Sequence, residues 1–212
     1  MKALIIANGT PPSRFLVRRL ASAADIVVCA DGGANHARPM RITPDIIVGD
    51  MDSITPSTKR QFHRVPTMLV DDQDSTDLEK TIQLCIDMMC TSVDIVGATG
   101  DRLDHTTGTL GCFKKFGKKV RLQLFDTVGV VSMIEKKIAF ASTVGEIVSL
   151  IPLERCEGVT THNLKYALQN ESLELGVREG ISNETTGRRV TISVKRGTLL
   201  LYRFRRVRNK TK

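Results

Sequence analysis

The sequence predicts an α/β protein in two parts, a parallel sheet with helices on both faces followed by a small antiparallel β-sandwich. In residues 1–133, continuous apolar runs alternate with segments of helical period, which is typical of parallel strands buried on both faces. In residues 134–212 the apolar runs are short, several alternate, and Gly, Asn or Pro break them. We therefore expect a Rossmann-like α/β domain over 1–133 and a β-sandwich domain over 134–212.

The strands and helices of the first part can be placed in chain order. Each of its apolar runs ends close to Gly or Asp, and these runs predict strands over residues 2–8, 25–31, 44–50, 66–72 and 93–101. Helical spacing of apolar residues predicts helices over 13–24, 76–90 and 104–116. Thr76 with Glu79 fits a capping box at the start of the second helix, and Gly117 is a good stop for the third.

The second part has no convincing helical period over most of its length. Its strand-like runs are "KIAFAST", "EIVSLIPL", "GVTTHNL", "SLELGV", "RRVTISVK" and "GTLLLYRFR". Short runs at this spacing, separated by turn residues, are typical of an antiparallel sandwich or barrel.

Composition limits the class of protein. Hydrophobic residues make up 41% and charged residues 25% of the 212 residues, and no apolar stretch has the roughly 20 residues of a membrane span. The start, "MKALIIANGT", lacks the length and cleavage site of a signal peptide, so it predicts a buried strand. The five cysteines form no CxxC pair. These features predict reduced thiols, a cytoplasmic location and no membrane partner.

The net charge of +8 raises the possibility of nucleic-acid binding. The last ten residues, "RFRRVRNKTK", hold six Lys or Arg and no acid, so the remaining 202 residues carry only 8 − 6 = +2. A basic end of this kind is more often solvated than bound to phosphates, and we expect no nucleic-acid partner.

Aspartates follow the predicted strands of the first part. They occur in "CADGGAN", "VGDMDS", "DDQDSTD" and "GATGDRLDH", which end or follow four of these strands. Because ligands of open parallel sheets bind at the carboxyl ends of the strands, we expect these carboxylates to converge. Asp50 and Asp52 lie one residue apart, and their repulsion requires a cation. Oxygen ligands without nearby Cys or paired His favour Mg²⁺ over Mn²⁺ or Ca²⁺, and we expect the ion to carry a nucleotide.

Glycines and basic residues near the same strand ends suit phosphate groups. Gly32-Gly33 and Gly97 with Gly100 allow close approach of backbone N–H groups to anions. Arg102 can bind phosphate oxygens bidentately, whereas His105 suits either a phosphate contact or a helix cap. The sequence has neither a G-x-x-x-x-G-K-[ST] nor a G-x-G-x-x-G after the first strand. A P-loop enzyme is thus excluded and a dinucleotide is disfavoured.

These motifs resemble one known family. "DGGAN" (31–35), "GDMDS" (49–53), "DQDSTDLEK" (72–80), "GATGDRLDH" (97–105) and "GISN" (180–183) resemble, in order and spacing, thiamin pyrophosphokinase. The resemblance implies transfer of a pyrophosphoryl group from ATP to the hydroxyethyl group of thiamin, giving thiamin diphosphate and AMP. It also implies Mg²⁺, a homodimer, and an α/β domain followed by a β-sandwich that contributes to the thiamin site and the dimer contact.

The resemblance also implies roles for individual residues. Asp50, Asp52 and Asp77 match the magnesium and triphosphate positions, Asp31 and Asp104 would support them, and Arg102 would hold phosphates. Beside these, we expect the nucleotide to be bound by the turn residues and the nearby histidine already described (Gly32, Gly33, Gly97, Thr99, Gly100 and His105). Gln73 resembles the residue that meets the thiamin pyrimidine, and Ser182 and Asn183 resemble the second-domain side of the thiamin pocket.

Two positions depart from the family pattern. Position 101 is Asp where the family motif commonly has Gly, and the chain has no Trp to stack on the thiamin pyrimidine. Tyr166, Tyr202 or a Phe would have to replace it. Two alternatives remain open, a pyrophosphokinase for another heterocyclic alcohol such as a hydroxymethylpterin, and a non-catalytic nucleotide- or nucleic-acid-binding module.

Overall fold

The computed structural model describes residues 1–70, 74–100 and 102–205, which form two compact units, Met1–Thr127 and Val128–Lys212. The division lies a few residues before the boundary expected between 133 and 134. The reason is β7 (Gly129–Ile134), which pairs along its whole length with β14 (Leu199–Phe204) and therefore belongs to the second unit.

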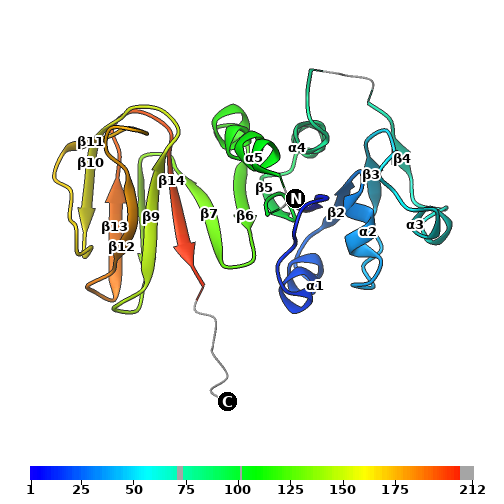
Figure 1. Ribbon diagram of the computed structural model, residues 1–212, viewed down its shortest axis with the longest axis horizontal. Helices are drawn as coiled ribbons and strands as arrows, with labels where there is room; N and C mark the ends of the chain where they lie inside the picture. Colours follow the sequence, from blue (N-terminus) through cyan, green and yellow to red (C-terminus); the bar gives the residue numbers. More distant parts are fainter. Residues whose placement is uncertain (71–73, 101, 206–212) are drawn as a thin grey trace, which may run out of the picture. The chain divides into compact units, whose positions relative to one another are not determined.

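The first unit contains a parallel sheet (Figure 1). Its strands lie in the order β6-β5-β1-β2-β3-β4, and each neighbouring pair is parallel. This confirms the predicted fold class. The strand bounds are β1 (Lys2–Ile6), β2 (Ile26–Ala30), β3 (Ile46–Val48), β4 (Thr67–Met68), β5 (Ser92–Val96) and β6 (Arg121–Phe125).

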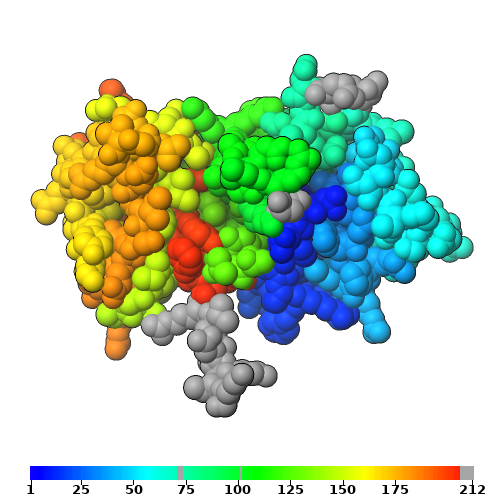
Figure 2. Space-filling model, in the orientation of Figure 1, coloured from blue at the N-terminus to red at the C-terminus, as the bar shows by residue number. Residues whose placement is uncertain are grey.

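Helices cover both faces of this sheet because successive strand residues point to opposite sides. Leu4, Ile6, Val27 and Cys29 form one core cluster with buried residues of α1 (Arg14–Ser22) and α2 (Gly33–Ala37). On the other face α4 (Asp77–Asp87) contacts β1, β2 and β3. The remaining helices are α3 (Pro56–Gln61) and α5 (Leu103–Phe116). Along α5, Leu103, Gly108 and Gly111 are exposed, and this helix lies at the surface in Figure 2.

The predicted helix ends are confirmed where capping signals exist. The Thr76 hydroxyl accepts a hydrogen bond from the Glu79 N–H while the Glu79 carboxylate accepts one from the Thr76 N–H, so the capping box is present. Gly117 follows α5 as its C-cap. Five of the described elements were not predicted, α2, α3, β6, β7 and β12 (Gly180–Glu184). The two helices have five and six residues, which is too short for an apolar period to show.

The second unit is a two-sheet sandwich, as predicted. One sheet has the antiparallel order β12-β9-β14-β7 and the other has β11-β10-β13-β8. Both sheets contribute to one buried apolar cluster, for example Leu150 and Leu199 from the first and Val159 and Ile192 from the second. The remaining bounds are β8 (Lys137–Ala141), β9 (Ile147–Pro152), β10 (Cys156–His162), β11 (Glu171–Leu173), β12 (Gly180–Glu184) and β13 (Arg189–Ser193).

Among the described residues, none of the helices combines the length and the apolar character required to cross a bilayer.

Candidate active site

A cavity of about 870 Å³ lies at the carboxyl ends of the parallel strands in the first unit. The chain leaves β1 toward β2 on one side and returns through β5 on the other, so the strand order reverses next to β1, where ligands of such sheets bind. Segments that follow β1, β2, β3, β4 and β5 line the cavity together with the first turns of α4 and α5. Its polar lining includes Asn8, Asp31, Asp50, Ser53, Thr76, Asp77, Lys80, Asp104 and His105.

Three carboxylates form a cluster at this edge. Asp31, Asp50 and Asp52 each offer an oxygen, and these oxygens lie within 4.8 Å of one another. Asp31 is 4% exposed, and its Oδ1 has no hydrogen-bond partner among the described residues. A buried carboxylate oxygen without a donor is costly, so this position fits a bound cation.

The backbone around β2 and β3 sets the geometry of the cluster. The Asp31 N–H donates to the Val48 carbonyl at 2.7 Å, which holds the end of β2 beside the end of β3. Gly49 has φ +142°, and a Cβ there would lie 2.7 Å from the Asp31 Cβ, so glycine is required for this approach. Met51, between the two exposed aspartates, has φ +67° and packs against the core cluster.

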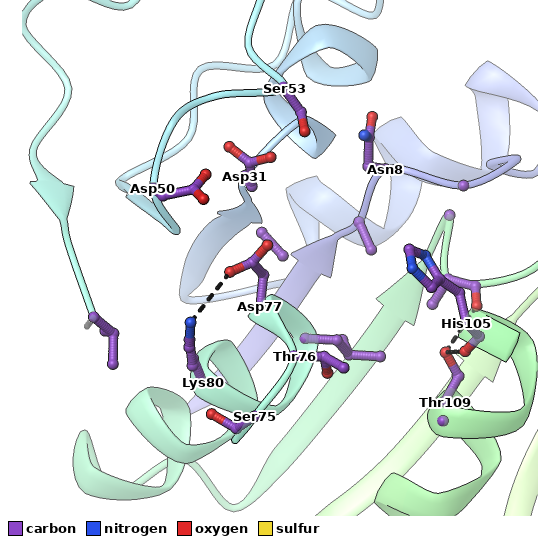
Figure 3. Close-up of a pocket in the computed structure, with 18 of the residues that line it drawn as sticks. Asn8, Asp31, Asp50, Ser53, Ser75, Thr76, Asp77, Lys80, His105 and Thr109 are labelled. Atoms are coloured by element: carbon purple, nitrogen blue, oxygen red, sulfur yellow. Dashed lines mark hydrogen bonds and ion pairs between the residues drawn. The ribbon is translucent and has the colours of Figure 1, made fainter. Parts of the chain in front are cut away.

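Asp77 faces this cluster from the first turn of α4 (Figure 3). Burial raises the pKa of its carboxyl group, and the charge of Asp31 raises it further, with smaller contributions from Asp50 and Asp52. Lys80, one turn later, lies 3.7 Å from Asp77 Oδ1 and opposes this shift of the pKa. The structure thus places Asp31, which was expected only to support the metal site, directly with Asp50 and Asp52.

The cluster suits Mg²⁺. It offers hard carboxylate oxygens, and no thiol or imidazole belongs to the group. Mg²⁺ takes few protein carboxylates and completes its shell with water and phosphate oxygens, which the cavity has room to hold. The residues present therefore fit the expected ion.

The predicted glycine turns have different surroundings. Gly97 lines the cavity, whereas Gly32, Gly33, Thr99 and Gly100 are absent from its lining. A Cβ on Gly33 would lie 1.9 Å from the Ile6 carbonyl oxygen, so this glycine allows α2 to pack against the end of β1. The contribution of Gly33 to the site is therefore the close placement of α2 beside β1.

Arg102 and Asp104 form a two-point ion pair at the start of α5. Arg102 Nε and Nη2 donate to the two carboxylate oxygens at 3.1 and 2.5 Å. Hydrogen bonding by Arg102 is the main reason why the pKa of Asp104 falls to about 2. Asp104 and His105 line the cavity, and the His105 N–H also donates to Asp104. A phosphate role for Arg102 thus requires it to share its donors with Asp104.

Of the three residues predicted for the thiamin site, the structure describes Ser182 and Asn183. Gln73 and the atypical Asp101 fall outside the residues that the structure describes. Ser182 is exposed on β12 with φ +56°, and its N–H donates to Ser149 Oγ at 3.0 Å. Asn183 is only 5% exposed, and its amide bonds the backbone of Tyr166 in both directions, at 3.1 and 2.8 Å. Asn183 therefore fixes the segment that carries Tyr166.

Some residues of the cavity were not predicted. Lys80 lies three residues after Asp77 and is thus on the same helix face, which is a signal that the sequence contains. Asn8 follows β1, and Ser53 follows the two exposed aspartates; both line the cavity. Their roles depend on which strands are neighbours, and one sequence does not give the strand order.

Fold and site together are typical of α/β enzymes that bind phosphorylated ligands at the carboxyl edge of a parallel sheet. Family models identify the particular group. Residues 17–125 match the thiamin pyrophosphokinase catalytic domain, and residues 128–199 match the thiamin pyrophosphokinase vitamin B1 binding domain. The chain belongs to the thiamin pyrophosphokinase family.

Individual relatives agree with this assignment. The chain is 30% identical to thiamine pyrophosphokinase 1 of Oryza sativa over 190 residues, covering 76% of the chain and 72% of the relative. It is 28% identical to thiamine pyrophosphokinase of Bacillus subtilis, covering 96% and 99%. The crystal structure of the Bacillus subtilis thiamine pyrophosphokinase aligns with a TM-score of 0.85 at 24% identity, covering 98% and 100%, which supports the fold.

Proposed function

We propose that this protein transfers a pyrophosphoryl group from ATP to thiamin, giving thiamin diphosphate and AMP. The observation that carries the proposal is the buried Asp31 carboxylate, which lies within 4.8 Å of Asp50 and Asp52 and, with Asp50, lines the cavity at the edge of the parallel sheet. In this reaction the thiamin hydroxyl attacks the β-phosphorus, and AMP leaves as negative charge builds on the phosphate oxygens.

The four carboxylates would hold Mg²⁺ and, through it, the triphosphate. Asp31, Asp50 and Asp52 are within reach of one ion, and Asp77 faces them from α4. Bound Mg²⁺ supplies positive charge to the phosphate oxygens. Lys80 is 11% exposed at its side chain and sits beside Asp77, so its ammonium group would add positive charge at the same cavity wall.

The start of α5 would position the remaining phosphates. The first N–H groups of this helix have no backbone acceptor within the helix, although the His105 N–H donates to the Asp104 carboxylate, and the helix dipole favours anions. Arg102 and His105 lie in this region, and Asp104 orients the guanidinium group of Arg102. We assign Arg102 to phosphate binding and Asp104 to positioning Arg102. Gly97 would let the nucleotide approach the backbone at the end of β5.

Tyr166 is the best candidate for stacking on the thiamin pyrimidine in this chain without Trp. It is 64% exposed, whereas the Tyr202 ring packs against Phe204 with centroids 4.6 Å apart. The Tyr166 N–H donates to Asn183 Oδ1 and Asn183 Nδ2 donates to the Tyr166 carbonyl, which fixes the Tyr166 backbone without covering the ring. We propose that Tyr166 stacks, Asn183 holds it, and Ser182 and Gln73 contact polar groups of thiamin.

We further infer a homodimer and a cytoplasmic location. The large apolar side chains Leu175, Val177 and Ile181 are exposed in and before β12, a pattern typical of protein contacts. All five cysteines are free and buried, which suits a reducing compartment. Light scattering on the purified protein tests the dimer, and a monomer at micromolar concentration would contradict it.

The direct test is incubation with ATP, Mg²⁺ and thiamin, followed by identification of both products. We expect AMP and thiamin diphosphate in equal amounts. ADP as the nucleotide product would indicate single-phosphate transfer and overturn the proposal. A hydroxymethylpterin offered in place of thiamin is the control acceptor. Faster pyrophosphoryl transfer to the pterin than to thiamin would show that thiamin is not the preferred substrate.

A further inference from the structure

We propose that Asn35 is a positioning residue that holds the loop of Asp50 and Asp52 at the distance from Asp31 that a metal ion requires. This inference rests on the proposed function, because it concerns the same metal site. We call residues 49–53 the carboxylate loop.

The contacts of Asn35 connect α2 to the end of this loop. Asn35 Nδ2 donates to the Ser53 carbonyl oxygen at 2.9 Å. Asn35 Oδ1 accepts from the Thr55 N–H at 3.0 Å and from the Thr55 hydroxyl at 3.1 Å. One amide thus binds the chain just before and at the N-cap of α3. Only a group with both a donor and an acceptor can make this set of bonds.

The start of the carboxylate loop is fixed by other means. The Gly49 N–H donates to the Met68 carbonyl at 3.1 Å, and Met51 packs against the core cluster. Inside the loop, the Asp52 N–H donates to Asp50 Oδ1 at 3.1 Å, and Ser53 Oγ donates to Asp52 Oδ1 at 2.9 Å. These inner bonds shape the loop, but they do not fix its far end relative to Asp31. Ile54, the next residue after the loop, is buried in the core cluster, and Asn35 adds the hydrogen bonds that connect this end of the loop to the segment of Asp31.

Asn35 can do so because it belongs to the same short segment as Asp31. The Ala34 N–H donates to the Asp31 carbonyl at 3.1 Å, and the Asn35 N–H donates to the Gly32 carbonyl at 2.9 Å. The tight packing of Gly33 on Ile6 fixes this turn against the sheet. The segment 31–35 therefore supplies one carboxylate of the cluster and, one helical turn later, the amide that holds the other two.

We call these hydrogen bonds of Asn35 to Ser53 and Thr55 the clamp, and it matters most when the metal is absent. Three carboxylates within 4.8 Å repel one another, and Asp50 and Asp52 lie on an exposed loop that can relieve the repulsion by moving away. A loop held in place avoids the cost of reordering when the ion binds. Partners behind metal ligands typically change metal affinity 10- to 100-fold when removed.

The test measures Mn²⁺ binding by electron paramagnetic resonance of the free ion, without nucleotide or thiamin. We expect Asn35→Ala to weaken Mn²⁺ binding about tenfold, in line with other residues behind metal ligands. Thr55→Val is the matched control, because it removes a hydroxyl bonded to Asn35 Oδ1 and to the start of α3 but keeps the bond from Asn35 to Ser53. It should lower thermal stability, yet leave Mn²⁺ affinity within about twofold, since the carboxylate loop stays anchored.

Three outcomes separate the inference from the proposed function. Equal Mn²⁺ affinity of folded Asn35→Ala and wild type overturns the role of Asn35, while the metal site stands. Absence of Mn²⁺ binding by the wild type overturns the metal site itself and this inference with it. If Asn35→Ala does not fold, Asn35→Asp replaces it, since it keeps the acceptor for Thr55 but loses the donor to Ser53. The added charge alone would tighten Mn²⁺ binding, so weaker binding by Asn35→Asp supports the clamp, whereas unchanged or tighter binding contradicts it.

Discussion

The two units of this chain build functional surfaces in opposite ways. In the first unit, residues far apart in sequence, such as Asp31, Asp50 and Asp77, meet because parallel strands end at one edge of a sheet. In the second unit, Tyr166 and Ser182 are presented by local backbone geometry on an antiparallel sandwich. The first arrangement concentrates charge, and the second exposes aromatic and apolar groups. Chemistry on phosphates suits the first, and recognition of a heterocycle suits the second.

Asparagine is used in a similar way in both units. Asn35 and Asn183 end the motifs "DGGAN" and "GISN", and each uses its amide to hold a neighbouring segment. In the first unit the held segment carries carboxylates, and in the second it carries an aromatic ring. Both units therefore place an amide behind the groups that would meet a ligand. Variants in the two units should differ in which substrate they affect.

The largest effect is expected from Asp50→Asn. Removing one carboxylate of the cluster should lower turnover at least 100-fold, because charge stabilisation at the reacting phosphates depends on the metal. Without Mg²⁺ the variant should melt at the same or a higher temperature than wild type, since it relieves repulsion with Asp31 and Asp52. Steady-state kinetics and thermal melting with and without Mg²⁺ check both expectations.

The matched control for this variant is Asp87→Asn, at the far end of α4, where Asp87 accepts a hydrogen bond from Gln83 at 2.8 Å. It removes the same charge from the same unit but lies outside the cavity lining. If Asp50→Asn unfolds without Mg²⁺ while Asp87→Asn does not, the carboxylate cluster is structural, and the metal proposal fails.

Much of the first unit could be predicted from its sequence. Buried parallel strands are continuous apolar runs, and the Thr76–Glu79 capping box marks the start of α4 within one residue. The convergence of aspartates followed from the rule that parallel strands end at one edge. The sequence did not predict that Asp31 itself belongs to the carboxylate cluster. Its position depends on β2 lying beside β3 and on the tight contact of Gly49 with Asp31.

A medium effect, confined to thiamin, is expected from Tyr166→Ala. Loss of one stacking ring should raise the Michaelis constant for thiamin about tenfold, which corresponds to about 1.4 kcal/mol. The constant for ATP should stay unchanged, because the carboxylates that would hold ATP belong to the first unit. Tyr166→Phe keeps the ring and is the control, with an expected change below about twofold since stacking is retained.

Asn183→Ala tests whether Asn183 acts on thiamin binding through Tyr166. Because Asn183 acts through the Tyr166 backbone, its removal should raise the constant for thiamin less than Tyr166→Ala does. In the double variant the two effects should not add, since both act through one ring. Additive effects, or equal effects on thiamin and ATP, would show that Asn183 acts through folding of the sandwich instead.

The sequence could not reveal this indirect role of Asn183. A hydroxyl and an amide in a turn suit a ligand contact and a backbone clamp equally well. Burial favours the backbone clamp, since Asn183 is only 5% exposed, and it lies on β12 where the pairing with β9 shifts register. The position of Lys80, in contrast, could be predicted from the sequence, because its spacing from Asp77 within a predicted helix places both residues on one helix face.

A few-fold effect of pH on metal affinity is expected from Asp77. Burial and the nearby carboxylates raise its pKa, so the folded metal-free protein binds a proton here more readily than the unfolded chain. Stability without metal should therefore fall as pH rises through the window above the usual Asp value, while Mg²⁺ affinity rises. Asp104 does not contribute in this window, because its pKa of about 2 keeps it ionised.

Melting curves with and without Mg²⁺, taken from about pH 4, close to the ordinary Asp value, upward to neutral pH, measure this linkage. In Asp77→Asn the pH dependence of stability should flatten, because the titrating group is gone. An unchanged slope in this variant would assign the effect to another carboxylate of the cavity.

The smallest effect is expected from removing residues 206–212. Four of the six basic residues at the end of the chain lie there, and this segment is outside the described residues. The other two belong to the sandwich, since Arg203 Nε bonds Glu146 Oε1 at 2.8 Å and the Arg205 N–H donates to the Val128 carbonyl at 2.8 Å. A cut after Arg205 therefore keeps the contacts of β14. Turnover with ATP and thiamin should stay within about twofold, because the proposed phosphate ligands all lie in the first unit.

The same truncation tests whether the basic end binds nucleic acid. Any binding of the full chain to DNA should weaken steeply with salt and disappear in the truncated protein, because it would rest on a few Lys and Arg contacts with phosphates. Titration of both proteins with a labelled duplex at low and high salt measures this. Salt-resistant binding that survives truncation would contradict the expected absence of a nucleic-acid partner. Such binding would indicate a nucleic-acid surface on one of the two folded units. In the turnover assay, a large loss of activity in the truncated protein would indicate that the basic end contributes to an active site.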